Sequence, residues 1–274
     1  MNFKQKYTLT KEYFLDLIFP KFCVGCGLEG NWVCETCKGN IVEVVTQICP
    51  DCQKISEHGR YCLKCRKKHK LSGIIVAAYY EEGPIKEAIH NLKYNNVTEL
   101  ADFLGSLMAK SLKSHREVVG KDAILTAAPM HFLRRAQRGY NQAEVLAKRV
   151  IVGLASGRPR SHSAALASLD SNYVRVTGAR SGGIPSRPTV DKLTLNFKII
   201  KKFRKTKSQV KFSGKNRREN LKNSFKIIDK NAVKNRHIII VDDVTTTGAT
   251  LEECAKVLRQ LGAKKVWGLV IARG

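Results

Sequence analysis

Acidic residues are scarce in this sequence, and long apolar runs are missing from it. The 274 residues include 23 Asp and Glu against 49 Lys and Arg, so the formal net charge at pH 7 is +26. Such an excess favours polyanionic partners, namely phosphate-rich small ligands, nucleic acid or an anionic membrane surface. The alternative is a solvated basic surface that has no dedicated partner.

The sequence has no segment with the length of a signal peptide or a membrane span. The apolar stretch F-L-D-L-I-F near the N-terminus is short and is interrupted by Asp16. We expect residues 1–22 to contain a short amphipathic helix that packs on its own domain, and we expect a cytoplasmic protein without membrane insertion. There is also no Ser-His-Asp arrangement and no catalytic zinc motif, so no catalytic residue is assigned.

Cysteine is concentrated in one short segment. Eight of the nine cysteines form four C-x-x-C pairs between residues 23 and 65. Two residues between thiolates let both sulfurs face one metal ion, and two such pairs complete a tetrahedral zinc site. A cross-braced pairing fits the same spacing, whereas disulfides are rare in cytoplasmic proteins and a redox dithiol needs only one pair. Sequential pairing predicts two structural zinc sites, the first at Cys23, Cys26, Cys34 and Cys37 and the second at Cys49, Cys52, Cys62 and Cys65.

The most informative stretch lies near the C-terminus and reads R-H-I-I-I-V-D-D-V-T-T-T-G-A-T. Residues 237–241 are an apolar, β-branched run that predicts a strand buried on both faces and ending before Asp242 and Asp243. A small polar loop follows, and the apolar spacing from Leu251 to Leu261 predicts a helix. Strand, loop and helix in this order present free backbone N–H groups to a phosphate.

The acidic pair beside this loop narrows the choice of ligand. Carboxylates near a phosphate are unfavourable unless neutral donors satisfy them, and a vicinal diol offers two such donors. A phosphate together with a 2,3-diol describes a ribose phosphate. The simpler interpretation, an acidic loop followed by a threonine helix cap, leaves the two carboxylates and the glycine unexplained. The stretch resembles the phosphoribosyl diphosphate (PRPP) signature of type I phosphoribosyltransferases, which implies PRPP contacts for Asp242, Asp243, Thr245, Thr246, Thr247, Gly248, Ala249 and Thr250.

The middle of the chain alternates strands and helices, which is typical of an α/β fold with a parallel sheet. Strands are expected at residues 74–80, 123–131, 193–200, 225–228 and 266–273. Helices are expected from Gly83-Pro84 to Leu92, at about 98–112, and from Gly139 onward. A strand end that is followed at once by arginines, as at residues 131–138, is where such sheets bind ligands.

A wider resemblance rests on several motifs that follow one another along the chain. They are H-N-L-K-Y at 90–94, the P-M-H turn, R-R-A-Q-R-G-Y-N-Q-A-E at 134–144, T-K-S-Q-V-K-F-S-G-K-N-R at 206–217 and the acidic loop, with the cysteine pairs ahead of them. Together they resemble the ComF family, bacterial proteins with an N-terminal double zinc ribbon and a type I phosphoribosyltransferase-like domain, linked to DNA uptake in natural transformation. The resemblance implies a helix and double zinc ribbon in residues 1–70 and a phosphoribosyltransferase-like domain in residues 71–274.

The same resemblance implies further ligand contacts. The turn after Ala128 falls on the diphosphate loop, and residues 203–220 fall on a mobile flap over such sites. A solvated loop is the alternative for the flap, and an ordinary helix end is the alternative for Lys93. The candidate diphosphate and flap contacts are Lys93, Ala128, Arg134, Arg135, Arg204 and Arg217.

Lysine is absent from residues 152–191, although both flanks are rich in it. The block uses Arg, Ser, Gly, Ala and Pro instead and has neither helical nor strand periodicity. We interpret it as an atypical, disordered insertion, because closing a longer surface loop costs only about 0.6 kcal/mol per doubling of its length. The alternative is an RNA- or DNA-binding arm.

Two functions therefore compete at this point. The first is phosphoribosyl transfer from PRPP to a nitrogen nucleophile, with Mg²⁺ held mainly by the ligand and with an acceptor that the sequence does not identify. The second is a non-catalytic zinc protein that binds single-stranded nucleic acid and keeps a vestigial PRPP pocket. Expected partners are PRPP or a related ribose phosphate, with single-stranded DNA and proteins of the competence machinery as further candidates.

Overall fold

The computed structural model describes residues 20–80, 83–120, 122–155, 173–176, 193–204, 221 and 224–274. The expected N-terminal helix, Arg217 and most of the lysine-free block lie outside the described residues.

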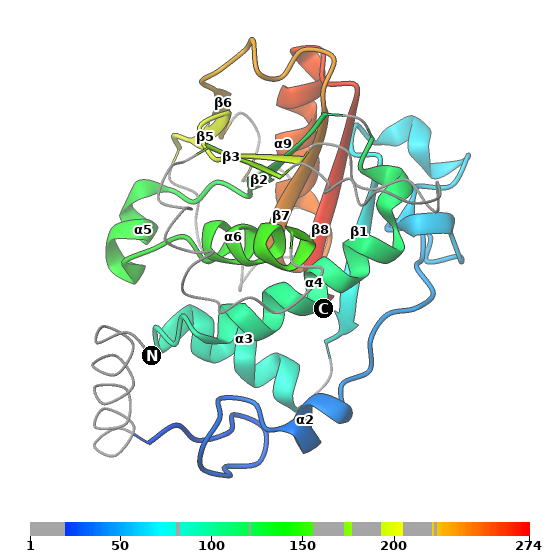
Figure 1. The fold of residues 1–274 in the computed structure, drawn as a ribbon. Helices are drawn as coiled ribbons and strands as arrows, with labels where there is room; N and C mark the ends of the chain where they lie inside the picture. Colours follow the sequence, from blue (N-terminus) through cyan, green and yellow to red (C-terminus); the bar gives the residue numbers. More distant parts are fainter. Residues whose placement is uncertain are drawn as a thin grey trace, which may run out of the picture.

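A central sheet with the strand order β1-β8-β7-β2-β4-β3 organises the chain (Figure 1). The first five strands in this order run parallel to their neighbours, and β3 pairs with β4 in the antiparallel direction. This arrangement confirms the expected parallel α/β fold. The strands are β1 (Gly73–Tyr79), β2 (Ala123–Ala127), β3 (Tyr173–Val176), β4 (Leu193–Asn196), β7 (His237–Thr245) and β8 (Lys265–Arg273).

Helices cover both faces of this sheet (Figure 1). On one face lie α3 (Pro84–Tyr94), α4 (Leu100–Ser114) and α6 (Gln142–Ala155), and on the other lies α9 (Ala249–Gln260). The unbroken apolar run of β7 follows from this layering. Ile239 and Val241 point into the core that includes α4 and α6, whereas Ile238 and Ile240 point into the core that includes α9.

The shorter elements are α2 (Glu35–Gly39), α5 (Phe132–Arg138), β5 (Ile200–Lys202), β6 (Phe225–Ile227) and the 3₁₀ turns η1 (Glu57–Gly59), η2 (Cys65–Lys68) and η3 (Arg116–Val118).

Three elements differ from the sequence-based expectation. Strand β7 continues through the acidic pair to Thr245, because β8 runs beside it and pairs with Asp242 and Val244. The single strand expected at 193–200 is two strands, since β5 leaves the main sheet and forms a hairpin with β6.

The lysine-free block is the third difference, because it contains regular structure. Helix α6 extends into it as far as Ala155, and residues Tyr173–Val176 form β3 against β4. These positions differ from the expected disordered insertion, and the remainder of the block lies outside the described residues. The short run Y-V-R-V pairs with the edge that β4 would otherwise leave open.

The N-terminal cysteine segment covers the opposite edge of the sheet, at β1. The Val44 amide donates to the Ala77 carbonyl at 3.0 Å. The Gln47 side chain accepts from the Val76 amide at 3.0 Å and donates to its carbonyl at 2.8 Å. An open edge strand invites pairing with other chains. The segment is thus built into the sheet domain along this edge.

The two halves of the cysteine segment join different cores. Cys23, Cys34 and Cys37 are buried with residues of α3 and α4, whereas Cys49 and Cys65 are buried with residues of α9. In Figure 1 the first half lies below α3 and α4, and the second half lies beside β1. The segment therefore wraps around β1 from one face of the sheet to the other.

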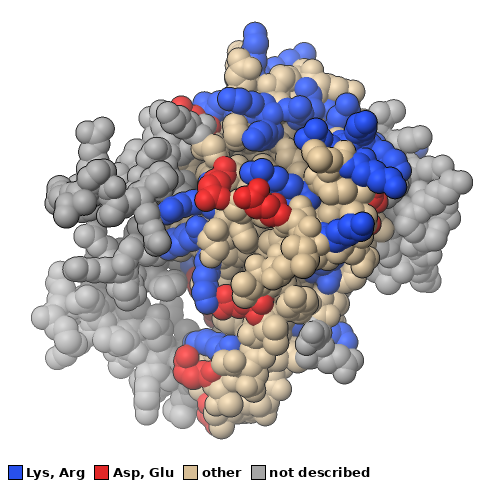
Figure 2. All heavy atoms as spheres, turned by 90° about the vertical axis from the view of Figure 1, so that its right-hand side faces the viewer, with Lys and Arg blue, Asp and Glu red and all other residues tan. Residues whose placement is uncertain are grey.

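Basic side chains are unevenly distributed over the surface. They gather over the upper part of the face seen in Figure 2, which is the side of the molecule that carries the second half of the cysteine segment. The exposed basic residues of this second half include Lys64, Arg66, Lys67, Lys68 and Lys70.

Within the described residues, no helix combines the length and the apolar composition that a bilayer span requires.

A histidine pair joins η1 to the end of α4. The Nδ1 atoms of His58 and His115 lie 3.0 Å apart, and His58 Nε2 lies 2.6 Å from a Glu117 carboxylate oxygen and 3.5 Å from one of Glu57. Burial and the neighbouring His58 lower the pKa of His115, with Glu117 acting in the opposite direction.

Acidification should weaken this junction. Because the pKa of His115 is lower in the folded chain than its ordinary value of 6.5, its contribution to stability is full above that pH and is lost as the pH falls through the folded value. We expect the pH dependence of Tm between about pH 7.5 and about pH 5.5 to be shallower for His115→Gln than for the wild type. The exposed His90, replaced by Gln, is the control, and equal slopes for His115→Gln and wild type would contradict the assignment.

Candidate functional site

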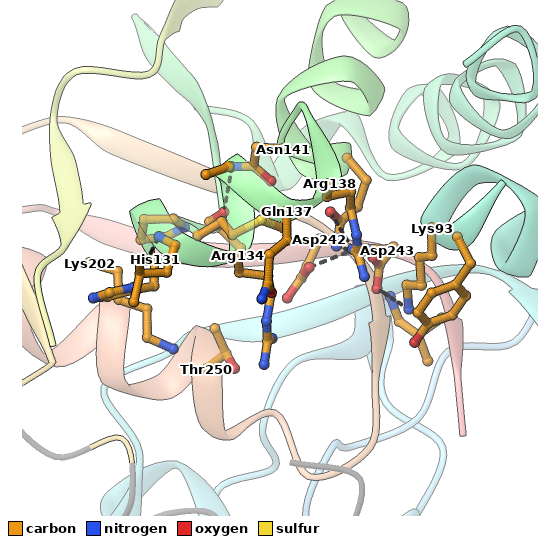
Figure 3. Close-up of a pocket in the computed structure, with 18 of the residues that line it drawn as sticks. Lys93, His131, Arg134, Gln137, Arg138, Asn141, Lys202, Asp242, Asp243 and Thr250 are labelled. Carbon is orange, nitrogen blue, oxygen red and sulfur yellow. Dashed lines mark hydrogen bonds and ion pairs between the residues drawn. The ribbon is translucent and has the colours of Figure 1, made fainter. Parts of the chain in front are cut away.

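A cavity of about 1150 Å³ opens at the carboxyl ends of β2 and β7 (Figure 3). This is the position at which parallel α/β sheets bind ligands. Its walls come from the end of α3, the turn after β2 with α5, the start of α6, β5 and the first turn of α9. Six of the residues selected from the sequence line it, namely Lys93, Ala128, Arg134, Asp242, Asp243 and Thr250.

Asp243 is held in place from three sides. Lys93 Nζ lies 2.8 Å from one carboxylate oxygen, and the Gln142 side-chain amide donates to the other at 2.7 Å. The Val244 amide also donates to this carboxylate, at 2.5 Å. Although burial opposes the charge on Lys93, the neighbouring Asp243 carboxylate raises the pKa of Lys93 overall. Asp243, only 4% exposed, is therefore a hydrogen-bond acceptor held in a fixed position.

Asp242 has a different environment from its neighbour. It is partly exposed to the cavity, and its carboxylate accepts the Asp243 amide at 3.0 Å. Burial and the adjacent Asp243 charge raise the pKa of Asp242 to about 7, with Lys93 and Lys202 acting in the opposite direction. A ligand that brings a cation or hydroxyl donors would favour its ionised form. The pair thus combines one fixed carboxylate with one whose charge responds to the ligand.

The threonine loop is closed on itself in this structure. Thr245 Oγ1 accepts the Gly248 amide at 3.0 Å, and Thr247 Oγ1 accepts the Ala249 amide at 3.4 Å. Gly248 has φ of 69°, a left-handed conformation that glycine adopts without strain. Only Thr250 of this loop lines the cavity, while Thr245, Thr246, Thr247, Gly248 and Ala249 lie beside it.

One end of the cavity is cationic, and of its residues the sequence selected Arg134 but not Lys202. Lys202, on β5, is only 8% exposed and shares this end with Arg134 and the buried His131 (Figure 3). Burial and the charge of Arg134 lower the pKa of Lys202 to about 8. Ile200 and Lys202 are buried on β5 and Lys201 is exposed, so the strand turns Lys202 inward.

Two amide side chains at the start of α6 support the site. Asn141 donates to the Ala128 carbonyl at 3.1 Å and so holds the turn after β2. Gln142 accepts from Arg138 at 2.8 Å while it donates to Asp243. Both belong to the G-Y-N-Q stretch used for the family resemblance, but spacing alone does not assign them a role.

Two other expected contacts lie away from the cavity. Arg135 forms an ion pair with Glu144 at 3.0 Å, and Arg204 is not among the lining residues. The ion pair with Glu144 therefore distinguishes Arg135 from Arg134, which the sequence treats alike.

The eight cysteines form two groups, and the grouping follows the sequential pairing. Within each group of four, all sulfur atoms lie within 4.8 Å of one another, with examples at 3.6 Å between Cys26 and Cys34 and 3.8 Å between Cys52 and Cys62. Tetrahedral zinc with bonds of about 2.3 Å separates its sulfurs by about 3.8 Å, so the groups fit structural zinc. Four thiolates close the coordination shell, so these sites offer no position to a substrate.

Comparisons with known proteins agree with this architecture. Residues 14–66 match the double zinc ribbon domain, and residues 168–273 match the phosphoribosyl transferase domain. The second match begins inside the lysine-free block. Ribbon and sheet together therefore define a zinc-ribbon protein with a phosphoribosyltransferase domain.

The similar proteins carry names from competence and DNA utilization. "Competence protein F" of Haemophilus influenzae is 28% identical over 263 residues, covering 88% of this chain and 98% of that protein. "DNA utilization protein YhgH" of Escherichia coli K12 is 27% identical over 263 residues, with 92% and 98% covered. "Competence protein ComFC" of Streptococcus pneumoniae is 23% identical over 242 residues, with 87% and 86% covered. Together with the two domain matches, these similarities support the resemblance to the ComF family.

The buried Lys202 predicts a pH dependence for anion binding in the cavity. Its pKa of about 8 means that it is charged below that pH and loses its charge as the pH rises through it. Phosphate monoesters are already largely ionised above about pH 7. We therefore expect the affinity for PRPP, which carries a diphosphate, to fall more steeply between about pH 7 and about pH 9 in the wild type than in Lys202→Gln, because the titration of Asp242 near pH 7 is common to both proteins. Calorimetry across this range checks it, and parallel profiles in the two proteins would refute a contact from Lys202.

Proposed function

We propose that this protein binds PRPP, or a closely related ribose phosphate, together with Mg²⁺ in the cavity. We also propose that it is a cytoplasmic protein that serves DNA uptake. The observation that carries the proposal is the convergence on one cavity of two carboxylates, of Thr250 at the start of α9, and of the cations Lys93, Arg134 and Lys202. Neutral hydroxyls satisfy carboxylates that a phosphate alone would repel.

Different residues of the cavity would contact different parts of PRPP. Asp242 and Asp243 would accept hydrogen bonds from the ribose hydroxyls, and the start of α9 with Thr250 would receive the 5-phosphate. Arg134 and Lys202 would hold the diphosphate at the cationic end. Mg²⁺, bound mainly by the ligand's diphosphate and diol, would supply additional positive charge to the leaving group.

The reaction that this arrangement supports is phosphoribosyl transfer. The bond between C1 of the ribose and the diphosphate oxygen breaks, the diphosphate leaves with the electron pair, and a nitrogen nucleophile forms the new bond to C1. Arg134 and Lys202 would stabilise the departing diphosphate electrostatically. Asp243, already fixed by Lys93 and Gln142, would keep the ribose in position during this exchange.

Removing either carboxylate should weaken PRPP binding. Hydrogen bonds to charged groups contribute about 1.5–3 kcal/mol, so Asp242→Asn and Asp243→Asn should each lower the affinity by about 10- to 100-fold. Titration calorimetry with PRPP and Mg²⁺ measures this, with the exposed Glu99→Gln as control. Affinities equal to the wild type would remove the proposed pocket. Diphosphate release in a screen of nitrogen acceptors then separates transfer from binding alone.

A second candidate function is the binding of single-stranded DNA by the basic face of the ribbon. The exposed residues Arg66, Lys67 and Lys68 support it, as do the names of the relatives. In this case the PRPP pocket would be a vestige without catalysis.

Salt dependence tests this second function. Binding to single strands through phosphates weakens with salt by a log–log slope of about −0.7 per contact, so replacing Arg66, Lys67 and Lys68 together by Gln should make the slope shallower by about 2. Fluorescence anisotropy with a labelled oligonucleotide measures the slope. The triple variant should keep the wild-type PRPP affinity, and salt-independent binding by the wild type would exclude a phosphate-tracking surface.

A further inference from the structure

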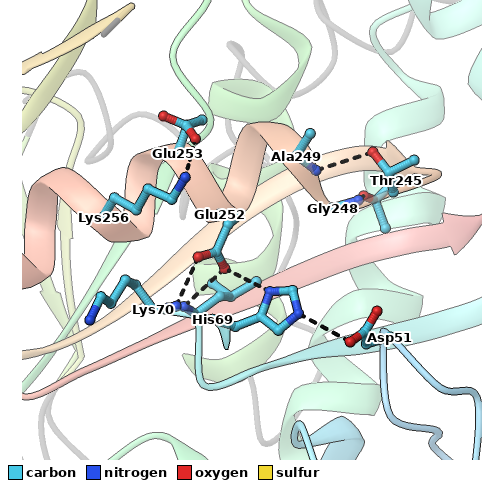
Figure 4. A network of polar contacts seen from close by, with 11 residues as sticks. Asp51, His69, Lys70, Thr245, Gly248, Ala249, Glu252, Glu253 and Lys256 are labelled. Carbon is cyan, nitrogen blue, oxygen red and sulfur yellow. Dashed lines mark hydrogen bonds and ion pairs between the residues drawn. The ribbon is translucent and has the colours of Figure 1, made fainter. Parts of the chain in front are cut away.

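Glu252 connects the phosphate loop to the second cysteine group. It lies in the first turn of α9, two residues after Thr250, and its carboxylate faces the ribbon (Figure 4). The carboxylate accepts the Lys70 amide at 2.8 Å and the Leu71 amide at 3.2 Å. Two backbone amides on one carboxylate, at the start of a helix, make a strong charge-assisted contact.

His69 extends this contact to the metal-binding segment. One ring nitrogen lies 3.4 Å from the Glu252 carboxylate, and the other lies 3.4 Å from the carboxylate of Asp51, between Cys49 and Cys52 (Figure 4). The His69 ring is stacked on Tyr61, with centroids 4.0 Å apart. His69 thus connects Asp51, within the second cysteine group, to Glu252 on α9.

The loop itself rests on the same segment. A Cβ atom placed on Gly248 would lie 3.2 Å from Ile74 and 4.0 Å from the Tyr61 hydroxyl. Ala249 and Leu251 share a buried core with Cys49 and Cys65. The first cysteine group instead packs with α3 and α4 on the opposite face of the sheet, which makes it an internal comparison.

We propose that Glu252 is a positioning residue that couples the second zinc group to the phosphate loop. Zinc at Cys49, Cys52, Cys62 and Cys65 would keep residues 69–71, which follow the ribbon, in their folded position. These residues in turn hold the first turn of α9 and the loop before it. Because such coupling is reciprocal, a ligand in the loop makes zinc at this group harder to remove. The ligand part of this proposal rests on the proposed PRPP function, whereas the structural part does not.

Hydrogen exchange tests the structural part without any ligand. In the zinc-loaded protein, Glu252→Gln should increase the exchange rates of the Gly248 and Ala249 amides about fivefold or more. The matched control is Glu43→Gln, which removes the 2.7 Å ion pair to Lys110 between the cysteine segment and α4 and should leave these amides unchanged. Wild-type exchange of the loop in Glu252→Gln would overturn the proposal, and so would a loss of protection spread equally over β7 and β8.

Zinc affinity tests the reciprocal part. In equilibrium competition with a zinc-chelating dye, PRPP and Mg²⁺ should raise the affinity for one of the two zinc ions about fivefold or more in the wild type and in Glu43→Gln, but not in Glu252→Gln. Equal zinc affinities with and without PRPP, in a protein shown by calorimetry to bind it, would refute the coupling and leave the PRPP site standing. Absence of PRPP binding would refute the proposed function, and the exchange experiment would still decide whether Glu252 holds the loop.

Discussion

The burial of β7 between β2 and β8 is the constraint on which the site depends. Residues 238–241 are fully buried, with alternate side chains in the two cores, so the strand has no freedom to rotate or to slip by one residue. Its next two residues, Asp242 and Asp243, therefore enter the cavity at the end of β2. The apolar run places the acidic pair, and the acidic pair then determines which groups must surround it.

Two carboxylates side by side at a buried position require compensation, and the structure supplies it from distant parts of the chain. Lys93 comes from α3, Gln142 from α6 and Lys202 from β5. Each of these side chains also lines the cavity, so the groups that stabilise the two carboxylates lie on its wall. The electrostatic cost of holding two acids is thus offset by cations that can also contact phosphate.

The sequence predicts the parts of this fold that depend on local pattern. The run of β-branched residues predicts a buried strand and the C-x-x-C spacing predicts metal-binding groups, and the structure contains the parallel sheet and two four-cysteine groups. Lys202 was missed because a lysine in a basic stretch looks solvated until β5 is known to turn it inward. Arg135 was grouped with Arg134, although only folding shows that Glu144 holds it outside. The strand at Tyr173–Val176 depends on the edge of β4, which no local pattern reveals.

The second half of the cysteine segment packs behind the threonine loop and supports it. A loop of threonine and glycine has little apolar surface to bury, yet it must present its backbone in one conformation. The second cysteine group provides a rigid support behind it, because zinc bound by four thiolates contributes about 10 kcal/mol or more to folding. Glu252 and Tyr61 bring that support to the start of α9, and Arg273 at the end of β8 donates to the Pro50 carbonyl at 2.7 Å beside the same group. A few short contacts therefore join the second cysteine group to the loop, and the ribbon supports the chain beside the cavity.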